Sequence, residues 1–204
     1  MVTPTLNLES SLWKKGFANI CGIDEVGRGS WAGPLVVAGV ILPQDFTIPE
    51  DLRDSKLTTP KQRESLSRII IELSKAYSIV EISSRQIDKL GLTKATNIAF
   101  RKVINTIRPQ PDFTLIDAFY IKHISRKRQQ AIKDGDKICA SIAAASIIAK
   151  VYRDNLMKKV HYAFPKYGFD KHVGYGTKLH QEAIVKNGLT RIHRRSYNLD
   201  FLYS

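Results

Sequence analysis

Apolar positions follow two different periods along the chain, and each period predicts its own kind of element. Short apolar runs bounded by Gly, Pro, Asn or Asp are typical of buried strands, and they cover residues 19–25, 34–42, 77–82 and 112–117. Apolar residues three and four positions apart are typical of helices, and they cover residues 60–76, 95–107, 141–160 and 178–186. Strands and helices therefore intermix, which predicts an α/β or α+β protein with its helices gathered in the last third.

The longest predicted helix, 141–160, carries core and polar positions on different faces. Its expected core face consists of small and branched residues: Ala143, Ala144, Ile147, Ile148 and Val151. Ser146, Lys150 and Asp154 are four residues apart and share another face. We expect Ser146 and Lys150 to meet a phosphate, whereas Asp154, next to Arg153, is expected to form a structural ion pair.

Composition narrows the class of protein. The 204 residues are 43% hydrophobic, which suits one globular domain, or a domain with an extension, that folds unaided. Cys21 and Cys139 lie far apart in apolar surroundings and are typical of reduced core residues. The longest apolar runs are too short to span a bilayer, and the start of the chain lacks the basic-then-apolar order of a signal peptide. The expected location is the cytoplasm.

The net charge of the chain gives the strongest indication of its binding partner. The 32 Lys and Arg residues outnumber the 19 Asp and Glu residues, which gives a net charge of +13. The excess is concentrated in residues 150–195 and in a shorter cluster over 122–128. Such a field attracts polyanions and favours a nucleic acid as partner, although general solubility would also account for it.

Carboxylates stand where two predicted strands end, a usual place for ligands. Asp24 and Glu25 end the first strand, Asp117 ends the strand over 112–117, and Asp136 precedes the long helix. A helix cap or an ion pair would explain a single Asp. The adjacent pair of acids needs a further explanation, because burial and mutual repulsion raise the pKa values of both carboxyl groups unless cations lie nearby. The pattern favours hard divalent cations bound through oxygen. Two Mg²⁺ ions can activate a water and stabilise the leaving oxygen when a phosphodiester is hydrolysed.

A glycine-rich turn follows the acidic pair directly. Gly27 and Gly29 flank Arg28. Glycine lets a backbone approach a ligand closely, and arginine makes a forked contact with phosphate. An ordinary tight turn would use the same residues, and the stretch matches neither a Walker loop nor a dinucleotide-binding turn. The turn is informative because of its place beside the acids.

In order and spacing, these motifs resemble those of the ribonuclease HII family over roughly residues 18–197. The matching blocks are GIDEVGRGSWAGPLVVAGVIL (22–42), DSKL (54–57), LID (115–117), GDKICASIAAASIIAKVYRDNLM (135–157), GYGTKLH (174–180) and HRRSY (193–197). The resemblance implies an α/β, ribonuclease H-like fold: a mixed five-stranded sheet flanked by helices, with a helical C-terminal extension. It implies a single domain over 1–204, with a catalytic core over about 17–155 and the extension over about 156–204.

The resemblance also implies an activity. The family hydrolyses the RNA strand of RNA–DNA hybrids and cuts on the 5′ side of single ribonucleotides embedded in duplex DNA, leaving 3′-hydroxyl and 5′-phosphate ends. Its cofactor is a divalent metal, Mg²⁺ or Mn²⁺, with two ions expected during catalysis. The implied role is ribonucleotide removal in DNA replication and repair, by a cytoplasmic protein that we expect to be a monomer.

Family roles carry over to particular positions. The metal-binding and catalytic acids correspond to Asp24, Glu25, Asp117 and Asp136. The turn that reads the ribose 2′-hydroxyl and grips the next phosphate corresponds to Gly27, Arg28 and Gly29. The junction-reading tyrosine corresponds to Tyr175, stacked on the deoxyribose that follows the ribonucleotide. Independently of the family, the 2′-hydroxyl is what separates RNA from DNA at a given residue, so a glycine turn beside the metals is a reasonable place to sense it.

Two positions depart from the family pattern. Ala118 stands where many relatives have Gly, a change expected to touch little. Lys56 is followed by Leu57 where a second Lys is common, which weakens the phosphate contact expected of Lys56.

Two other assignments share part of this pattern. Ribonuclease HIII carries an extra N-terminal domain and a Lys where Arg28 stands, which argues against it. A non-catalytic RNA-binding or ribosome-associated protein would fit the +13 charge, but a pure binder gains nothing from carboxylates where phosphates must lie. The remaining candidates for catalysis are expected to pack or to contact phosphate instead: His161, His172, His180 and His193.

Overall fold

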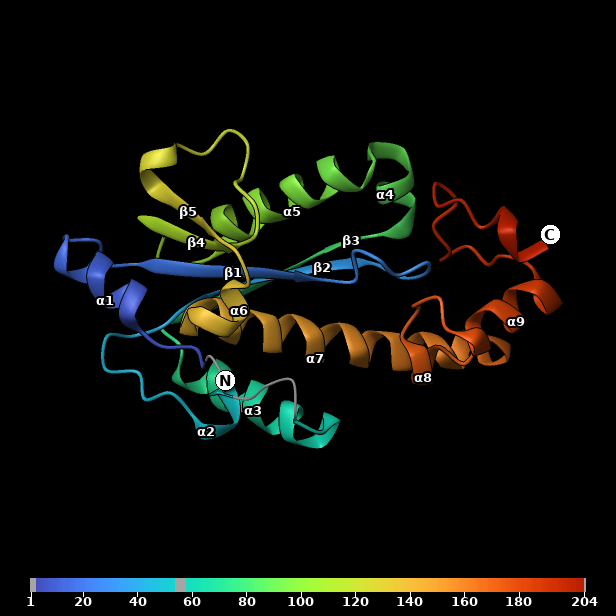
Figure 1. The fold of residues 1–204 in the computed structure, drawn as a ribbon, viewed down its shortest axis with the longest axis horizontal. Helices are drawn as coiled ribbons and strands as arrows, with labels where there is room; N and C mark the ends of the chain where they lie inside the picture. The colour runs from blue at the N-terminus through green and yellow to red at the C-terminus, as the bar shows by residue number, and fades with distance from the viewer. Residues whose placement is uncertain (1–2, 54–57, 204) are drawn as a thin grey trace.

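A five-stranded sheet forms the centre of the protein (Figure 1), in a computed structural model that describes residues 3–53 and 58–203. The strands lie in the order β3-β2-β1-β4-β5. Their bounds are β1 (Ile20–Val26), β2 (Leu35–Ile41), β3 (Ala76–Ile82), β4 (Phe113–Asp117) and β5 (Gln129–Ile132). The β1–β2 and β2–β3 pairs are antiparallel, whereas β1–β4 and β4–β5 are parallel. The expected mixed five-stranded sheet is confirmed.

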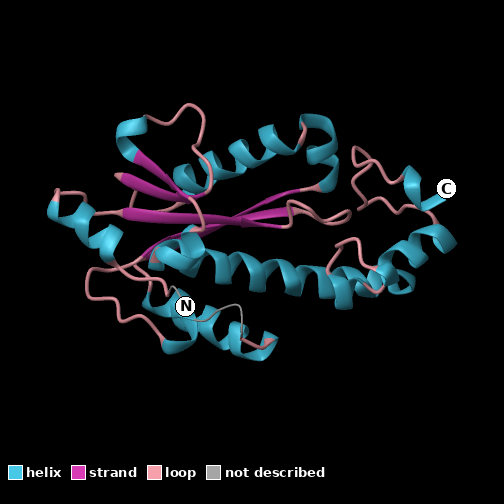
Figure 2. Ribbon diagram, viewed as in Figure 1, coloured by secondary structure: helices cyan, strands magenta, loops and turns pink. Residues whose placement is uncertain are grey.

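Helices cover both faces of the sheet (Figure 2). The α-helices are α1 (Asn7–Lys14), α2 (Glu50–Arg53), α3 (Pro60–Leu73), α4 (Ser84–Leu90), α5 (Leu92–Thr106), α6 (Gly135–Ile138), α7 (Ala140–Ala163), α8 (Phe169–His172) and α9 (Lys178–Asn187). Short 3₁₀ turns are η1 (Arg126–Arg128), η2 (Pro165–Tyr167) and η3 (Asp200–Tyr203). Among the described residues, no helix has the length and apolar content needed to cross a membrane.

Strand β2 explains why the sequence there is apolar without a break. Every residue from Leu35 to Ile41 is buried, because alternate side chains enter two different cores. Val36, Ala38 and Val40 pack with α3 and α7. Leu35, Val37 and Ile41 pack with α5 on the opposite face. Burial on both sides removes the usual alternation of apolar and polar residues.

Helix α7 packs closely against β1 at its N-terminal end. A Cβ atom at Gly22 would lie 2.2 Å from the carbonyl carbon of Ser141, so only glycine allows this approach. The buried side chain of Glu9, from α1, accepts a hydrogen bond from the Ser141 N–H at 2.8 Å. Glu9 therefore caps the start of α7, where the helix dipole favours a negative charge.

The second half of α7 belongs to another core. Met157 packs with Ala32, Tyr167, Phe169 and Ile184 in a cluster of the C-terminal region. The boundary expected near residue 155 falls inside this helix. We propose that the catalytic core and the extension form one folded unit, since α7 supplies side chains to both.

The eight elements that the apolar pattern predicts are present, with shifted ends. The helix predicted to reach residue 76 ends at Leu73, because β3 already begins at Ala76. Six of the described helices and strands were not predicted from the pattern: α1, α2, α4, α6, α8 and β5. Strand β5 gives no apolar signal because its buried Gln129 takes a core position by bonding to the backbone of Ile121.

Candidate active site

The register of the parallel strands brings the predicted acids to one edge of the sheet. Ile23 of β1 pairs with Ile116 of β4, so the next residues, Asp24 and Asp117, lie at the same edge. Strand β5 lies beside β4, and Asp136 follows it in α6. The charges of Asp117 and Asp136 both act on Asp24. Segments more than 90 residues apart along the chain thus place carboxylates together.

Asp24 is the buried centre of this group. Burial raises the pKa of Asp24 to about 7, against hydrogen bonds that lower it, and the charges of Asp117 and Asp136 add to the rise. The hydroxyl of Ser146 on α7 is the first of those hydrogen-bond partners. The N–H of Glu25 is the second and lies 2.7 Å from the Asp24 Oδ1. Ser146, expected to meet a phosphate, therefore lies against the acidic centre.

Glu25 is also held in an unfavourable environment for a charge. Burial raises the pKa of Glu25 to about 8, and the neighbouring Asp24 raises it further. Arg28 opposes this rise, with its guanidinium 3.6 Å from the Glu25 Oε1. The other oxygen, Oε2, is buried and has no hydrogen-bond partner in the described part of the protein.

The end of β4 is tied to α6 through Asp117. Its Oδ1 accepts a hydrogen bond from the Gly135 N–H at 2.7 Å. Ala118 then adopts a left-handed conformation, with φ at 59°. Glycine takes this conformation without the steric cost that Ala pays. The departure from the family pattern at Ala118 is therefore a real local strain.

The donor set fits a hard divalent cation. Carboxylate oxygens are the ligands such cations prefer, and the buried Glu25 Oε2 is an acceptor with its capacity unused. Within the described residues, no three Asp, Glu, His or Cys side chains are already gathered as a metal cage.

The two glycines of the turn after β1 serve different needs. Gly27 has a φ of 88°, and a Cβ there would lie 2.3 Å from the Arg153 Nε. Glycine at position 27 is therefore required by the fold itself. Gly29 is exposed, and a Cβ there would meet nothing within 4 Å. The open side of Gly29 is where a ligand can approach the backbone.

Two buried arginines brace this turn, and sequence reasoning missed both. Arg153 donates from Nε to the Pro34 carbonyl at 3.0 Å and from Nη2 to the Ser30 hydroxyl at 2.8 Å. Arg194 donates from Nη1 to the Arg28 carbonyl at 2.8 Å. Buried cations are costly unless hydrogen-bonded. Backbone carbonyls and the Ser30 hydroxyl meet most of that need here, although the Arg153 Nη1 has no hydrogen-bond partner in the described part of the protein. Only the positions of these residues inside the YRD and HRRSY blocks hinted at a role.

Asp154 forms the structural ion pair expected of it, but its partner is Lys150 and not the neighbouring Arg153. Arg153 points into the protein, and Asp154 instead accepts from the Lys150 Nζ at 2.7 Å. The i,i+4 spacing on α7 favours this partner. Lys150, expected to meet a phosphate, is thus held beside a carboxylate on the face that also carries Ser146.

Tyr175 lies beside the glycine-rich turn although the two are far apart in sequence. The guanidinium carbon of Arg153 is 5.4 Å from the centroid of the Tyr175 ring. The carbonyl of Gly174 accepts a hydrogen bond from the Trp31 N–H at 2.8 Å. The segment 174–176 is therefore docked on the chain that leaves Gly27–Gly29.

The other predicted contact residues have separate outcomes. Arg28 lies between Glu25 and the ring of Phe119, whose centroid is 4.7 Å from the guanidinium carbon. Lys56 lies outside the described residues. His161 pairs with Asp170 at 3.1 Å. The three other histidines of the C-terminal region are buried and pack, as expected of them.

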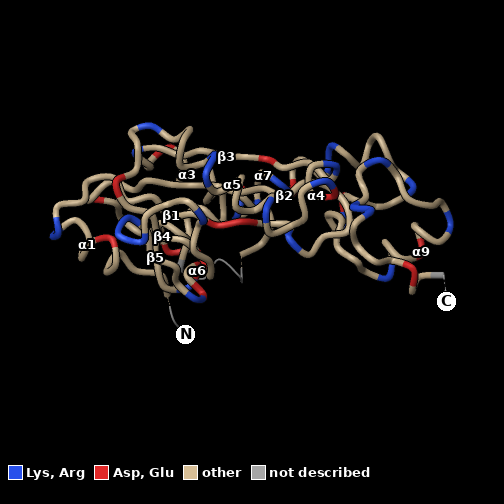
Figure 3. Tube along the Cα trace, turned by 90° about the horizontal axis from the view of Figure 1, so that it is seen from above, with Lys and Arg blue, Asp and Glu red and all other residues tan. Residues whose placement is uncertain are grey.

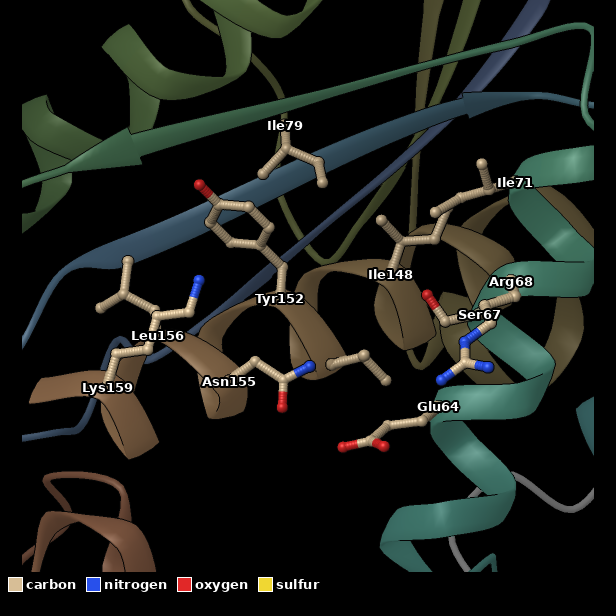
Figure 4. A pocket seen from close by; sticks show the side chains of 11 residues that line it. Glu64, Ser67, Arg68, Ile71, Ile79, Ile148, Tyr152, Asn155, Leu156 and Lys159 are labelled. Atoms are coloured by element: carbon tan, nitrogen blue, oxygen red, sulfur yellow. The ribbon is translucent and has the colours of Figure 1, made fainter. Parts of the chain in front are cut away.

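Concave and basic surfaces extend beyond the acids. A pocket between α3, α7 and β3 is lined by Arg68, Tyr152 and Lys159 among others, and by none of the predicted site residues (Figure 4). Lys and Arg positions recur along the whole trace, including its C-terminal part (Figure 3). Basic residues therefore occur well beyond the acidic positions, which suits a polyanionic ligand.

Comparison with known proteins adds a family to this geometry. The family described as Ribonuclease HII matches residues 21–199. A ribonuclease HII from Dehalococcoides mccartyi is 42% identical over 193 residues, which cover 93% of this chain and 90% of that protein.

Solved structures agree on the fold. The ribonuclease H2 of Pyrococcus horikoshii superposes with a TM-score of 0.72 at 26% identity, over 88% of this chain and 94% of that one. Bst-RNase HIII in complex with Mn²⁺ gives a TM-score of 0.64 at 22% identity, over 83% of this chain and 63% of that one, and shares the fold.

Proposed function

The chain belongs to the ribonuclease HII family and so is a ribonuclease H that cleaves the RNA strand of RNA–DNA hybrids, and from this premise we propose that it also cuts 5′ of single ribonucleotides in duplex DNA. The observation that carries the proposal is the common sheet edge of Asp24 and Asp117, with the open Gly29 close behind it in the chain. A site that joins acids to an exposed backbone can couple hydrolysis to recognition of one sugar.

We propose that the four acids hold the divalent metal on which ribonucleases H depend, as Mg²⁺ or Mn²⁺ and with two ions during catalysis. The acids are Asp24, Glu25, Asp117 and Asp136. When bound, the metal supplies Lewis acidity that stabilises charge developing on the phosphate oxygens. The proposal is supported by the all-oxygen donor set and by the unpartnered Oε2 of Glu25.

The remaining roles belong to residues that bind and orient the substrate. The backbone at Gly27 and Gly29 receives the ribose 2′-hydroxyl, and Arg28 contacts the neighbouring phosphate. Tyr175 stacks on the deoxyribose after the ribonucleotide. Ser146 orients Asp24 by its hydrogen bond. The phosphate contacts that we propose for Ser146 and Lys150 extend to Lys56 on the family pattern alone. Hydrolysis on the 5′ side of the ribonucleotide leaves 3′-hydroxyl and 5′-phosphate ends.

The same proposal includes a working context. Ribonucleotide-containing DNA arises where DNA is copied and repaired, so we assign the protein to that task in the cytoplasm. We propose that it acts as a monomer, because the acids and the recognition turn come from a single chain.

One assay tests the proposed function. A duplex with a single embedded ribonucleotide is incubated with the protein and Mg²⁺, beside an all-DNA duplex of the same sequence. We expect one cut, 5′ of the ribonucleotide, that requires the metal, and no cut in the control. Cleavage of a continuous hybrid but not of the single ribonucleotide would refute the proposed specificity.

A substitution separates recognition from chemistry. Tyr175→Ala removes a stacking contact worth roughly 1–3 kcal/mol by analogy with base–aromatic contacts. It should therefore reduce cleavage at an RNA–DNA junction more than cleavage of a continuous hybrid. Tyr162→Ala is the matched control, since Tyr162 is 84% exposed. Equal losses on both substrates would make Tyr175 a packing residue.

A further inference from the structure

Three buried histidines lie beneath the segment that carries Tyr175. His172 ends α8, His180 lies in α9 and His193 follows α9 in the chain. The Nε2 atoms of His180 and His193 are 3.0 Å apart. The rings of His172 and His180 stack with centroids 4.4 Å apart. Nothing in the proposed reaction uses these side chains.

The backbone partners decide which nitrogen of each ring carries the proton. A carbonyl only accepts hydrogen bonds, so the His180 Nδ1, 3.0 Å from the Tyr175 carbonyl, is protonated. In a neutral ring the His180 Nε2 is then an acceptor, and the His193 Nε2 donates to it. The His193 Nδ1 in turn accepts from the Thr190 N–H at 2.9 Å. The hydrogen bonds run in one direction, from Thr190 to Tyr175.

His172 is fixed in the same way. Its Nε2 lies 2.7 Å from the Tyr167 carbonyl and so carries a proton. Its Nδ1 accepts from the Gly174 N–H at 3.1 Å. Two adjoining backbone groups of the segment 174–176, one N–H and one carbonyl, are therefore held by histidines.

The arrangement requires all three rings to be neutral. Burial lowers the pKa of His180 and of His193 to about 4, and burial lowers the pKa of His172. The charged groups that face the cluster are Asp170, which acts on His172, and Arg195, which acts on His193. The other neighbours are rings of Trp31, Tyr167 and Phe169. Since each ring nitrogen already has a partner, these histidines are not available as metal ligands or bases.

We propose that His172, His180 and His193 are positioning residues that fix the segment 174–176, and with it Tyr175, against the glycine-rich turn. The inference rests on the proposed function in one respect, that Tyr175 contacts the substrate. The histidines hold one side of the segment, and the Trp31 N–H holds the other through the Gly174 carbonyl. The three histidines and their hydrogen bonds form a histidine relay (His172, His180 and His193). This histidine relay therefore sets the distance between Tyr175, which reads the junction, and the glycine-rich turn, which reads the ribose.

Low pH should weaken the histidine relay. The direction of this pH effect follows from the lowered pKa values of the histidines. A proton added to the His180 Nε2 replaces an acceptor by a donor that faces the donor of His193. Between the ordinary pKa near 6.5 and about 4, the unfolded chain binds more protons than the folded one. The stability contributed by the neutral histidines is thus complete above pH 6.5 and declines as the pH falls through this window.

A spectroscopic test does not depend on activity. The imidazole nitrogens of ¹⁵N-histidine-labelled protein report the tautomer at pH 7. We expect the proton of His180 on Nδ1, and the protons of His172 and His193 on Nε2. A proton on the Nε2 of His180, or a charged ring at neutral pH, would overturn the relay whatever the protein cleaves.

Variants of His193 test positioning. His193→Phe keeps an aromatic ring but removes the donor to His180, whereas His193→Gln keeps an N–H near the position of Nε2. A shift of the segment by about 1 Å can cost about 100-fold in rate. We expect His193→Phe to lose junction cleavage at least about 10-fold more than cleavage of a continuous hybrid, and His193→Gln to restore most of it.

A control keeps the outcomes distinct. Tyr162→Phe changes a ring that is 84% exposed and outside the relay, and it should leave the ratio of the two rates unchanged. An unchanged ratio in His193→Phe, with the expected tautomers, would overturn the positioning role and leave only a structural one. Failure of the wild type to cut either substrate would refute the proposed function, while the tautomers would still decide the relay.

Discussion

At the scale of single residues, the candidate site holds carboxyl groups in surroundings that disfavour their charged form. Asp24 and Glu25 have raised pKa values because they are buried and lie near other carboxylates. Arg28 lies near Glu25, and Ser146 and two backbone N–H groups donate to the acids. These contacts hold the acids in place without matching their charge, so a bound cation would stabilise the native state.

Asp117→Asn should abolish cleavage and leave the fold intact. The amide has nearly the size of the carboxylate and can still accept the Gly135 N–H, but it is a poorer ligand for a hard cation. Thermal stability without metal should hold or rise, because Asp117 raises the pKa of Asp24 and of Glu25 by repulsion. Cleavage at saturating Mg²⁺ and thermal melting would be measured, with Asp45→Asn at an exposed position as control. Activity above about a tenth of wild type would contradict the ligand assignment.

Ala118→Gly should stabilise the protein. Ala118 has a φ of 59°, a conformation that costs a residue with a Cβ roughly 1–2 kcal/mol. Glycine loses about 0.4–1 kcal/mol more in ordering the chain, so the net gain is on the order of 0.5 kcal/mol. Urea unfolding would measure it. Ala163→Gly, at the exposed end of α7, should instead destabilise, and a loss at both positions would show that the strain is absent.

At this scale the sequence predicted those residues whose type and neighbours indicate one particular chemistry. Paired acids and a glycine-rich turn are recognisable because few other functions need them together. Arg153 and Arg194 were missed because a buried arginine bonded to carbonyls has the same spacing as a surface arginine. The histidine relay was missed for a similar reason, since its backbone partners lie 2 to 5 residues away and its one side-chain pair is 13 residues apart.

At the scale of elements, the turn after β1 is a rigid device. Arg153 from α7 and Arg194 from the C-terminal segment bind its carbonyls from two sides. The open backbone of Gly29 is therefore presented by a supported loop. Preorganisation of this kind lets a small misplacement have a large effect on rate.

Gly29→Ala and Gly27→Ala should fail in different ways. A Cβ at Gly29 meets nothing in the protein, so the variant should melt like wild type yet lose cleavage by about 100-fold if the ribose must approach this backbone. A Cβ at Gly27 would collide with Arg153, so that variant should lose stability as well. Melting temperatures, cleavage rates and duplex affinity would be compared. Full activity in a folded Gly29→Ala protein would place recognition of the 2′-hydroxyl elsewhere.

Elements with a strong apolar period were predictable, and those held by polar contacts were not. Helices α3, α5, α7 and α9 each bury a continuous face. Helix α4 is short, and its signal lies in a capping box of Ser83 and Gln86. Strand β5 depends on the buried Gln129. The five-strand count therefore came from family resemblance, since the period alone gave four strands.

At the scale of the whole molecule, the surplus positive charge is unevenly distributed along the chain. The N-terminal α1 and the C-terminal helices lie at opposite ends of the long axis (Figure 1), with the sheet between them. Most of the surplus positive charge falls in residues 150–195. A duplex that reaches from the acids toward Tyr175 would therefore meet lysines and arginines along its backbone.

Binding should accordingly weaken steeply with salt, and Lys150 should contribute to this. Each phosphate contact adds about −0.9 to the slope of log K against log salt concentration. Lys150→Ala should make the slope shallower by about one unit and weaken all-DNA and ribonucleotide-containing duplexes about equally. Because Asp154 holds the Lys150 Nζ at 2.7 Å, Asp154→Asn should have the opposite effect and strengthen binding to both duplexes.

Lys14→Ala, at the end of α1, serves as control. Equilibrium titrations at several salt concentrations would decide the matter: a loss confined to the ribonucleotide-containing duplex would mean that Lys150 reads the sugar instead of the phosphate.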